Sequence, residues 1–435
     1  MQRPARPRKN AAIPSPAGSN SLWLRVGILI DGTGRTPLAD SHVVYDKSSI
    51  LFVGSGRDTP PPHVLNPGQT QPDFDLPNYT LLPGLIEAHT HLFLEGGELN
   101  AAKRSARLTR SREELLNAAI LRIEKLLLLG IIGVRDAGDK IGIGLSLSSL
   151  CTSGKSPLMP FVDSPGAAIY HRGHYGSFMG DPLEEYISPR KCVLSRIGDG
   201  AERIKLIASD IIDFKAGGVT KDPQMSSDEI AAFVAAAAEF GKQTFAHASG
   251  EKGIENVVEG RIGSVEHGYF IRDDQLARMR DRQIAWVPTF SPLEQQIKHS
   301  EKIGWDDRTT STMRRILDEH AASLLTAHAL GVPIAAGSDS GAIGVRHGLG
   351  LLEEMELMEG AGLSSIDVIN TATGISSDRL SFKEKFGKIA PGYRSRFILT
   401  EHSPLDGVSH LRREKFLVYD SVVIKCGEEP DTAGL

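Results

Sequence analysis

The sequence predicts an α/β protein in which a (β/α)8 barrel is accompanied by a small two-part β-sandwich. Three observations predict this fold. Short apolar strands alternate with capped helices over residues 83–385. The flanking segments, 21–82 and 386–428, contain strands and turns without helical periodicity. Histidines and an aspartate also stand at the ends of several strands, which is where a parallel barrel gathers its chemistry.

The two ends of the chain have a different character from its middle. Residues 1–20 are basic and rich in proline and lack the apolar core of a signal peptide, so we expect a disordered extension. The first β segment, 21–82, opens with the strand "LWLRVGILIDGTG" and continues with a hairpin in "SHVVYDKSSILFVGSG". Strands return in 386–428, and we expect both segments to form one sandwich, followed by a short tail at 429–435.

The middle of the chain carries the barrel pattern. Seven segments have the length and apolar character of parallel strands: 81–88, 131–136, 203–209, 243–248, 264–267, 284–290 and 333–338. We expect the eighth within 145–180, near "PGAAIYH". Helices lie between the strands, and two of them open with capping boxes, Ser111 with Glu114 and Ser226 with Glu229. Eight such units in about 300 residues fit a (β/α)8 barrel.

Bulk properties exclude several classes of partner. The formal net charge of −5 gives no support for nucleic acid as the main partner. No apolar run approaches the roughly 18 residues that span a bilayer. The three cysteines lie far apart and form no CxxC motif, which indicates a reducing compartment. We therefore expect a cytoplasmic protein with a small-molecule substrate, and a homo-oligomer is compatible with the sequence.

Polar residues stand at the ends of five predicted strands. His89 and His91 close the first strand in "EAHTH", and strand alternation sends both side chains to the same face. The complete set is His89, His91, Lys205, His247, His267 and Asp339. Each would be unremarkable alone, because the chain has 14 histidines and a lone lysine or aspartate is common. Together they predict a divalent metal site, since imidazole and carboxylate are the ligands that zinc selects.

Here the chain resembles the amidohydrolase superfamily of metal-dependent hydrolases, in the imidazolonepropionase-like and dipeptidase-like (Xaa-Pro or Xaa-Arg dipeptidase-like) branch. The resemblance covers residues 21–428. The motifs that carry it are "PGLIEAHTH", "GVRDAG", "RIKLIAS", "AHASG", "SVEHG", "AAGSDSG" and "IAPGYRSRF". The ordered set is specific for the superfamily, and no member of it identifies the substrate.

The resemblance implies two divalent metal ions, with Zn²⁺ as the default. His89 and His91 would bind the more buried ion together with Asp339. His247 and His267 would bind the second ion. A hydroxide between the metals, with its pKa lowered towards about 7, would attack the substrate carbonyl. Asp339 would take the proton from this nucleophile and deliver it to the leaving group.

The resemblance also implies that Lys205 is carboxylated and bridges the two metals. A free ammonium has no lone pair and repels cations, whereas a lysine carbamate is anionic and bidentate. Lys215 in "DFKAGG" is the competing lysine, and we rank it lower because it falls in a predicted loop after the strand.

A polar, aromatic loop follows the expected third strand in "AIYHRGHYGSFMG". His174 matches the position of a histidine that helps hold the substrate in dipeptidase-like relatives, where it would donate to the carbonyl or oxyanion. We expect Tyr170, Arg172 and Tyr175 to form the pocket wall, and a surface loop is the alternative.

One departure weakens a dipeptidase assignment. Dipeptidase-like relatives commonly carry a carboxylate-binding tyrosine two residues after the histidine of the fifth strand, and this chain has Ser249 there. Arg172 could supply that contact, and Tyr269 is either a local replacement or a core residue. Since few charged residues other than Arg172 stand near the motifs, we expect a neutral or weakly anionic substrate.

The sequence therefore predicts a hydrolase that acts on a small amide, an N-acyl amino acid or dipeptide, a carbamate or a cyclic amide. A mononuclear metal-dependent deaminase is one alternative, and Lys205 argues against it because such relatives usually lack this lysine. A non-catalytic barrel scaffold is the other alternative, although all six ligand positions are filled. Asp136, His347 and Glu354 are interpreted as structural.

Overall fold

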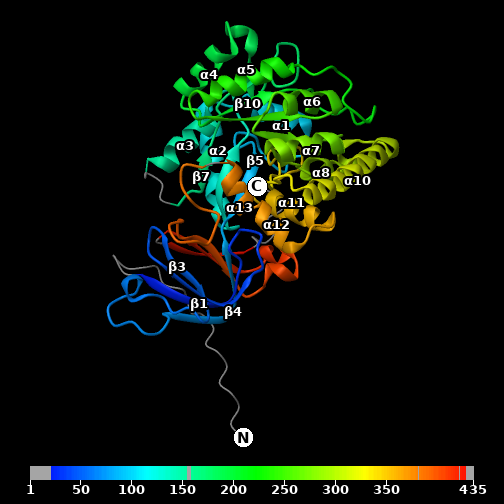
Figure 1. Cartoon of the computed structure of the whole chain (residues 1–435). Coiled ribbons are helices and arrows are strands. Elements are labelled where there is room, and N and C mark those ends of the chain that lie inside the picture. The colour runs from blue at the N-terminus through cyan, green and yellow to red at the C-terminus, as the bar shows by residue number, and fades with distance from the viewer. Residues whose placement is uncertain (1–20, 154–157, 381, 421, 428–435) are drawn as a thin grey trace.

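The computed structural model describes residues 21–153, 158–380, 382–420 and 422–427. The expected N-terminal extension, 1–20, and the tail, 429–435, lie outside these described residues. Figure 1 shows a helix-rich part formed by the middle of the chain and a β-rich part formed by segments from before and after it. The β-rich part includes the blue strands of the N-terminal segment and the red strands of the C-terminal segment.

One seven-stranded sheet forms the β-rich part, in the order β16-β15-β14-β4-β1-β2-β3. Its strands are β1 (Leu22–Leu29), β2 (Leu38–Tyr45), β3 (Ile50–Ser55), β4 (Phe74–Pro83), β14 (Arg396–Thr400), β15 (Lys415–Tyr419) and β16 (Val422–Cys426). β4 pairs with β14 in antiparallel register, so that Pro83 lies opposite Phe397. This pairing joins the N-terminal segment to the C-terminal segment within one sheet.

The seven-stranded sheet bends around a core of its own. The rings of Tyr45 on β2 and Phe397 on β14 meet edge to face with their centroids 5.0 Å apart. β2 and β14 are not neighbours in the sheet, because β4 and β1 lie between them. The core that they share also contains Leu24, Val26, Leu81, Leu399 and Val418. The bend therefore gives the sheet an enclosed apolar face, as a β-sandwich has.

The helix-rich part contains two parallel sheets. The first has the order β5-β6-β7 and the second β13-β12-β11-β10-β8-β9. Their strands are β5 (Leu85–Thr90), β6 (Ile131–Asp136), β7 (Phe161–Asp163), β8 (Ala168–Tyr170), β9 (Gly180–Pro182), β10 (Arg203–Ile207), β11 (Gln243–Ala248), β12 (Ser264–His267) and β13 (Ala285–Val287). Every strand pair in both sheets is parallel. The predicted α/β class with parallel sheets is confirmed.

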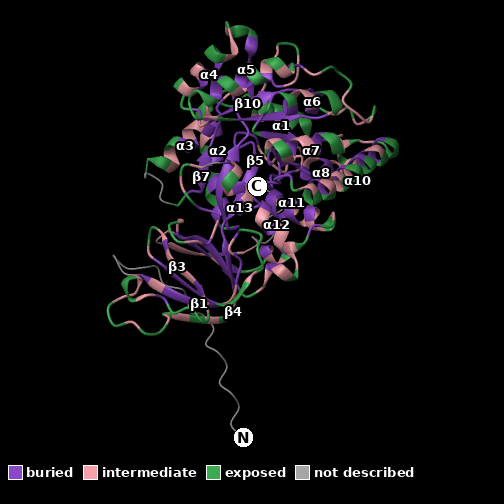
Figure 2. Cartoon of the chain, in the orientation of Figure 1, coloured by how far each residue is buried: buried purple, intermediate pink, exposed green. Residues whose placement is uncertain are grey.

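Helices lie between these strands and after the last of them. They are α1 (Ala101–Arg107), α2 (Arg112–Leu127), α3 (Ile143–Thr152), α4 (Pro189–Gly198), α5 (Ser227–Ala238), α6 (Glu251–Glu259), α7 (Asp273–Arg282), α8 (Ser291–Lys298), α9 (Ser300–Ile303), α10 (Asp307–Leu330), α11 (Leu349–Gly360), α12 (Ser365–Thr371) and α13 (Gly374–Leu380). Both predicted capping boxes form, at Ser111 with Glu114 and at Ser226 with Glu229. Figure 2 shows buried strands surrounded by helices that expose one side.

Two strands differ from the sequence-based prediction. The first barrel strand begins at Leu85 rather than at residue 81, because 81–83 belong to β4 and pair with β14. The expected third strand is two short strands, β7 beside β6 and β8 beside β10. Pro165 and Gly166 lie between them, and proline and glycine interrupt strands.

The predicted last strand, 333–338, forms only an isolated bridge at Ile334. Its backbone nevertheless has partners on both sides. The amide of Trp286 on β13 donates to the carbonyl of Pro333 at 2.9 Å, and the amide of Ala88 on β5 donates to the carbonyl of Ala336 at 2.9 Å. This segment therefore lies between β13 of one parallel sheet and β5 of the other.

Candidate metal centre

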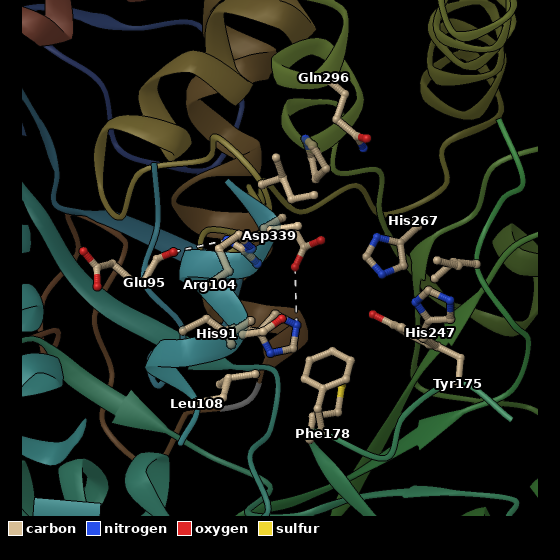
Figure 3. A pocket seen from close by; sticks show the side chains of 18 of the residues that line it. His91, Glu95, Arg104, Leu108, Tyr175, Phe178, His247, His267, Gln296 and Asp339 are labelled. Atoms are coloured by element: carbon tan, nitrogen blue, oxygen red, sulfur yellow. Dashed lines mark hydrogen bonds and ion pairs between the residues drawn. The ribbon is translucent and has the colours of Figure 1, made fainter. Parts of the chain in front are cut away.

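The carboxyl ends of the parallel strands face a cavity of about 760 Å³. The six ligand candidates predicted from the sequence all line this cavity: His89, His91, Lys205, His247, His267 and Asp339. They come from β5 and the residue that follows it, from β10, β11 and β12, and from the segment that follows 333–338. Figure 3 shows His91 and Asp339 on one side of the cavity and His247 and His267 on the other.

Three of these residues form a compact group. Nε2 of His91 lies 3.3 Å from Oδ1 of Asp339, and Nε2 of His89 lies 3.6 Å from the same oxygen. One candidate ligand atom from each residue falls within 4.8 Å of the other two. Two imidazoles and a carboxylate at this spacing can share one divalent ion, since zinc binds such donors at about 2.0–2.2 Å.

A second pair of imidazoles lies beside this group. The ring centroids of His247 and His267 are 4.6 Å apart, and those of His267 and His89 are 5.1 Å apart. Within the described residues, the buried Nε2 atoms of His89 and His247 have no hydrogen-bond partner. A buried nitrogen without a hydrogen-bond partner destabilises the fold unless it binds a ligand or a metal ion. The residues present therefore fit a metal centre.

Lys205 lines the same cavity as these imidazoles, with 2 % of its surface exposed, and its Nζ lies 4.6 Å from the centroid of the Phe245 ring. Burial lowers the pKa values of His89, His91 and His247, and the charge of Lys205 lowers them further. Lys215, the competing lysine, also lines the cavity, but it is an exposed residue in the loop after β10. Of the two lysines, only Lys205 is buried within the cavity that the histidines line.

Burial sets the protonation of the site. It lowers the pKa of His91 and of His247 to about 3, so both rings are neutral near neutral pH. Burial also lowers the pKa of the Lys205 ammonium to about 8 and raises the pKa of Asp339 to about 7. A neutral imidazole carries the lone pair that binds a metal, so the cavity favours the ligand form of its histidines.

Two buried side chains orient His89. Its Nδ1 lies 2.6 Å from Oε2 of Glu266, and Nη2 of Arg135 lies 2.8 Å from the same carboxylate oxygen. Arg135 also donates from Nε to the carbonyl of Ala88 at 2.6 Å. With a carboxylate at Nδ1, the proton sits on that nitrogen, and the lone pair of Nε2 faces Asp339.

Other polar contacts fix the segments that carry the remaining residues. Glu87 accepts hydrogen bonds from the amide of Ser338 at 2.8 Å and from its hydroxyl at 2.6 Å, which ties β5 to the segment before Asp339. Nδ1 of His267 lies 2.7 Å from Oγ1 of Thr289. His267, Thr289 and Asp339 have φ angles of 68°, 53° and 53°. Such left-handed conformations are strained for residues other than glycine, and they concentrate at functional sites.

The sequence model of the amidohydrolase family matches residues 80–425. The chain belongs to this family. It is similar to ochratoxinase of Aspergillus niger, with 24 % identity over 440 residues that cover 95 % of this chain and 88 % of the relative. Its structure is similar to that of a Xaa-Pro dipeptidase with bound methionine, with a TM-score of 0.78, 24 % identity, and coverage of 93 % of this chain and 100 % of that one. The crystal structure of A. niger ochratoxinase gives a TM-score of 0.76 at 22 % identity, covering 96 % of this chain and all of that one.

As an amidohydrolase, the protein is a hydrolase of carbon–nitrogen bonds, and its family uses divalent metal. The His89, His91 and Asp339 group is consistent with that use. In the part of the chain that the structure describes, no helix has the length and hydropathy to cross a membrane.

The predicted substrate contacts fall into two groups in this amidohydrolase. Tyr175 and Tyr269 line the cavity, and the ring of Tyr175 lies 5.4 Å from that of His247. The Tyr269 hydroxyl donates to the carbonyl of Thr289 at 2.9 Å, and its ring stacks on His320 at 4.1 Å. Tyr269 therefore lines the cavity and also supports the loop after β13.

Tyr170, Arg172 and His174 are not part of the cavity lining. The Arg172 side chain is 64 % exposed and pairs with Glu185 at 3.3 Å. Nδ1 of His174 lies 3.5 Å from Oδ2 of Asp210. In this structure Arg172 and His174 therefore lie outside the set of residues that line the cavity, and their contact with a substrate stays a prediction.

Several site residues do not stand out in the sequence motifs. Glu87 and Glu266 each precede a predicted ligand by one or two residues within an otherwise apolar strand, and a buried carboxylate at that spacing is a usable signal. The cavity wall also includes α1 with Arg104, which the motifs did not indicate. More cationic side chains line the cavity than we expected, namely Arg104, Arg107, Arg110 and Arg122.

Proposed function

We propose that this amidohydrolase cleaves the amide-type C–N bond of a small molecule, with N-acyl amino acids and dipeptides favoured over carbamates and cyclic amides. The observation that carries the proposal is the convergence of four imidazoles, Lys205 and Asp339 at one cavity. Similarity to an ochratoxinase and a Xaa-Pro dipeptidase supports the amide class. A volume of about 760 Å³ suits a small ligand rather than a folded protein.

We infer that two divalent ions, zinc by default, are held by this residue set. His89, His91 and Asp339 would hold one ion, which their spacing within 4.8 Å supports. His247 and His267 would hold the other. Carboxylated Lys205 would bridge the two, because an ammonium enclosed among ligands would repel the ions. When bound, the metals supply Lewis-acid activation of the carbonyl and of water.

The protein side chains would then handle the proton and the geometry. Asp339 is the proposed general base and acid, which holds a proton at Oδ and delivers it to the leaving nitrogen. The Asp339 side chain is 16 % exposed, so it reaches the cavity while most of its surface is shielded from solvent. Glu87, through Ser338, would keep the Asp339 segment in register with β5.

We also infer that the two parallel sheets close into a (β/α)8 barrel over residues 83–385, with 21–82 and 386–428 forming the separate β domain. Backbone bonds on both sides of 333–338 support closure at one seam. The amide of Glu202, before β10, donates to the carbonyl of Ser164, after β7, at 3.0 Å, which supports closure at the other seam.

The proposal is tested by metal content, carbamate content and turnover together. Purified protein is expected to hold close to two ions per chain and to show a carbamate ¹³C resonance after incubation with ¹³C-bicarbonate. Lys205→Ala should lose that resonance and at least about 100-fold of the activity against N-acyl amino acids. The matched variant Lys215→Ala should retain the resonance and the metal content.

Other outcomes would favour the alternatives. One ion per chain, no carbamate and release of ammonia from a ring amine would favour a mononuclear deaminase. Failure to retain metal after expression in metal-rich medium would favour a non-catalytic scaffold. Full activity of metal-free Lys205→Ala would contradict the proposal outright.

A further inference from the structure

Arg104 lies in the cavity wall on α1, half-buried beside the candidate metal centre. Its Nη1 donates to the carbonyl of Glu95 at 3.2 Å, and its Nη2 donates to the carbonyl of Gly341 at 2.8 Å. Gly341 is two residues beyond Asp339, so the second bond keeps the guanidinium near that carboxylate. Figure 3 shows Arg104 beside Asp339, on the side of the cavity away from His247.

The charge of Arg104 is poorly compensated by its neighbours. Both acceptors are backbone carbonyls, and among the described residues no carboxylate oxygen lies within 4 Å of its guanidinium. Arg107, one turn later, instead pairs with Oε1 of Glu95 at 2.7 Å. Burial lowers the pKa of Arg104, and the strongest opposing influence is Asp339. If Asp339 binds a metal ion, its negative charge also compensates that ion, and less of it is left to compensate Arg104.

The surroundings of Arg104 limit what can use this charge. The walls of the cavity include large apolar side chains on several elements, among them Phe93, Leu108, Phe178, Ile212, Phe214 and Trp305. A ligand that fills the cavity therefore meets large apolar surfaces as well as cationic side chains, and can place an anion near Arg104 while its amide lies near Asp339. The two bonds that Arg104 makes use two of the five N–H donors of a guanidinium.

We propose that Arg104 binds the carboxylate of the substrate, and that the substrates are N-acyl amino acids with a free carboxylate and a bulky apolar acyl group. In such a molecule the α-carboxylate stands one carbon away from the nitrogen of the scissile bond, so the metal centre and Arg104 can engage both groups together. Hydrolysis adds water across the acyl C–N bond, which yields a carboxylic acid and a free amino acid. This inference rests on the proposed function.

A purely structural role for Arg104 makes a different prediction. If Arg104 only ties the loop at Gly341 to Glu95, its loss should affect all substrates alike. A carboxylate anchor should instead affect a substrate with a free carboxylate far more than the matching carboxamide. A charge-assisted hydrogen bond corresponds to about a 10- to 100-fold change in kcat/KM.

The test uses the metal-loaded enzyme with N-benzoyl-leucine and N-benzoyl-leucinamide. Arg104→Gln is expected to lower kcat/KM for N-benzoyl-leucine (the acid) by about 10- to 100-fold, mainly through KM. It should lower kcat/KM for N-benzoyl-leucinamide (the amide) by less than about 3-fold. Arg104→Lys should recover part of the preference for the acid. Arg107→Gln removes the same charge from the same helix and should change the acid-to-amide ratio by less than about 3-fold.

Two turnover results would overturn the inference. In one, Arg104→Gln lowers kcat/KM for both probes equally. In the other, Arg107→Gln shifts the acid-to-amide ratio as much as Arg104→Gln does. That result would indicate long-range electrostatic attraction by the positive charges of the cavity rather than a direct contact between Arg104 and the substrate carboxylate.

Binding without turnover separates this inference from the proposed function. Calorimetry on metal-loaded Asp339→Asn should show tighter binding of the acid than of the amide, and adding Arg104→Gln should abolish the difference. If the wild-type enzyme hydrolyses neither probe but this difference is found, the inference stands and the proposed function fails. If the acid does not bind, or binds no more tightly than the amide, the inference is overturned whatever the turnover.

Discussion

His89 and Glu266 are 177 residues apart in the chain, yet Nδ1 of the histidine lies 2.6 Å from Oε2 of the carboxylate. Glu266 directly precedes His267 on β12, so one short strand contributes a candidate ligand and also orients a ligand on β5. Arg135 on β6 pairs with the same carboxylate at 2.8 Å. Three strands are therefore coupled through one buried hydrogen-bond network, and removing its carboxylate should affect the metal centre and stability together.

The first prediction concerns Glu266→Gln. The amide side chain keeps the shape but removes the charge that fixes the His89 tautomer, so metal affinity should fall by about 10- to 100-fold. Arg135 would be left buried without its anion, which should lower the free energy of unfolding by about 3–5 kcal/mol. Competition with a chelating dye measures the first effect, and urea unfolding measures the second. Glu255→Gln, at a surface pair with Arg278, is the control and should change neither. Unchanged metal affinity in Glu266→Gln would contradict the orienting role.

The second prediction concerns metal removal. Metal that binds only the folded chain stabilises it by about 4 kcal/mol when its free concentration is 1,000 times Kd. A strong chelator should therefore lower Tm by several degrees, and zinc should restore it. His247→Ala should reduce the difference between the two Tm values. His328→Ala, a partly exposed histidine on α10, should leave it unchanged. An identical chelator effect in His247→Ala and wild type would contradict a ligand role for His247.

The third prediction concerns pH and His320. This buried ring packs on Tyr269 and donates from Nε2 to the carbonyl of Pro288 at 3.0 Å, and burial lowers its pKa to about 4. An unfolded histidine has a pKa near 6.5, so between about pH 6.5 and 4 the unfolded state binds a proton that the folded state does not. The contribution of His320 to stability is therefore complete above pH 6.5 and falls as the pH drops, by up to about 1.4 kcal/mol per unit.

Urea unfolding at pH 7, 6 and 5 measures this slope. His320→Gln keeps a donor for the Pro288 carbonyl but cannot titrate, so its stability should fall less steeply with acid than that of wild type. His63→Gln in the N-terminal β segment lies on the exposed surface and should follow the wild-type curve. The prediction fails if wild type and His320→Gln lose stability in parallel from pH 7 to 5.

The fourth prediction concerns the contact between Tyr45 and Phe397. Phe397 is fully buried, and its loss to alanine should leave a cavity in the core of the seven-stranded sheet. The expected cost is about 3–5 kcal/mol in the free energy of unfolding, while the metal content of the folded fraction stays at the wild-type value. Phe240→Ala, at a partly exposed phenylalanine after α5, is the control and should cost far less. A mild effect of Phe397→Ala would mean that the bend of the sheet relaxes around the cavity.

Local patterns predicted a large share of the fold. The strand 131–136 has the predicted limits, and the capping boxes at Ser111 and Ser226 form as expected, because both depend on neighbours in sequence. The division of the third strand was not predicted, because β7 and β8 have three residues each and no periodicity is visible over so short a length. Segment 333–338 looked like an ordinary strand, and only its long-range partners reveal how loosely it pairs.

Prediction of the candidate site from sequence also stops where long-range contacts decide the position of a residue. Residues at strand ends could be gathered from sequence, because parallel strands bring their carboxyl ends to one edge. Arg104 could not, since its place depends on a hydrogen bond to Gly341, 237 residues away. The motif predicts Arg172 in the pocket, but its side chain is exposed, pairs with Glu185 and is not part of the cavity lining. Pairings between charged side chains on separate loops leave no periodic trace in sequence.

The pairing of β4 with β14 has a consequence for how the protein is made. Pro83 and Phe397 are more than 300 residues apart, so the ribosome must add the whole metal-binding part before β4 meets its partner. At about 5–20 residues per second this takes on the order of 15–60 s. Throughout that interval the emerging chain carries a strand with one unpaired edge, which is a template for association with other nascent chains. Synthesis of this enzyme should therefore depend strongly on chaperones that shield strand edges until the last segment arrives.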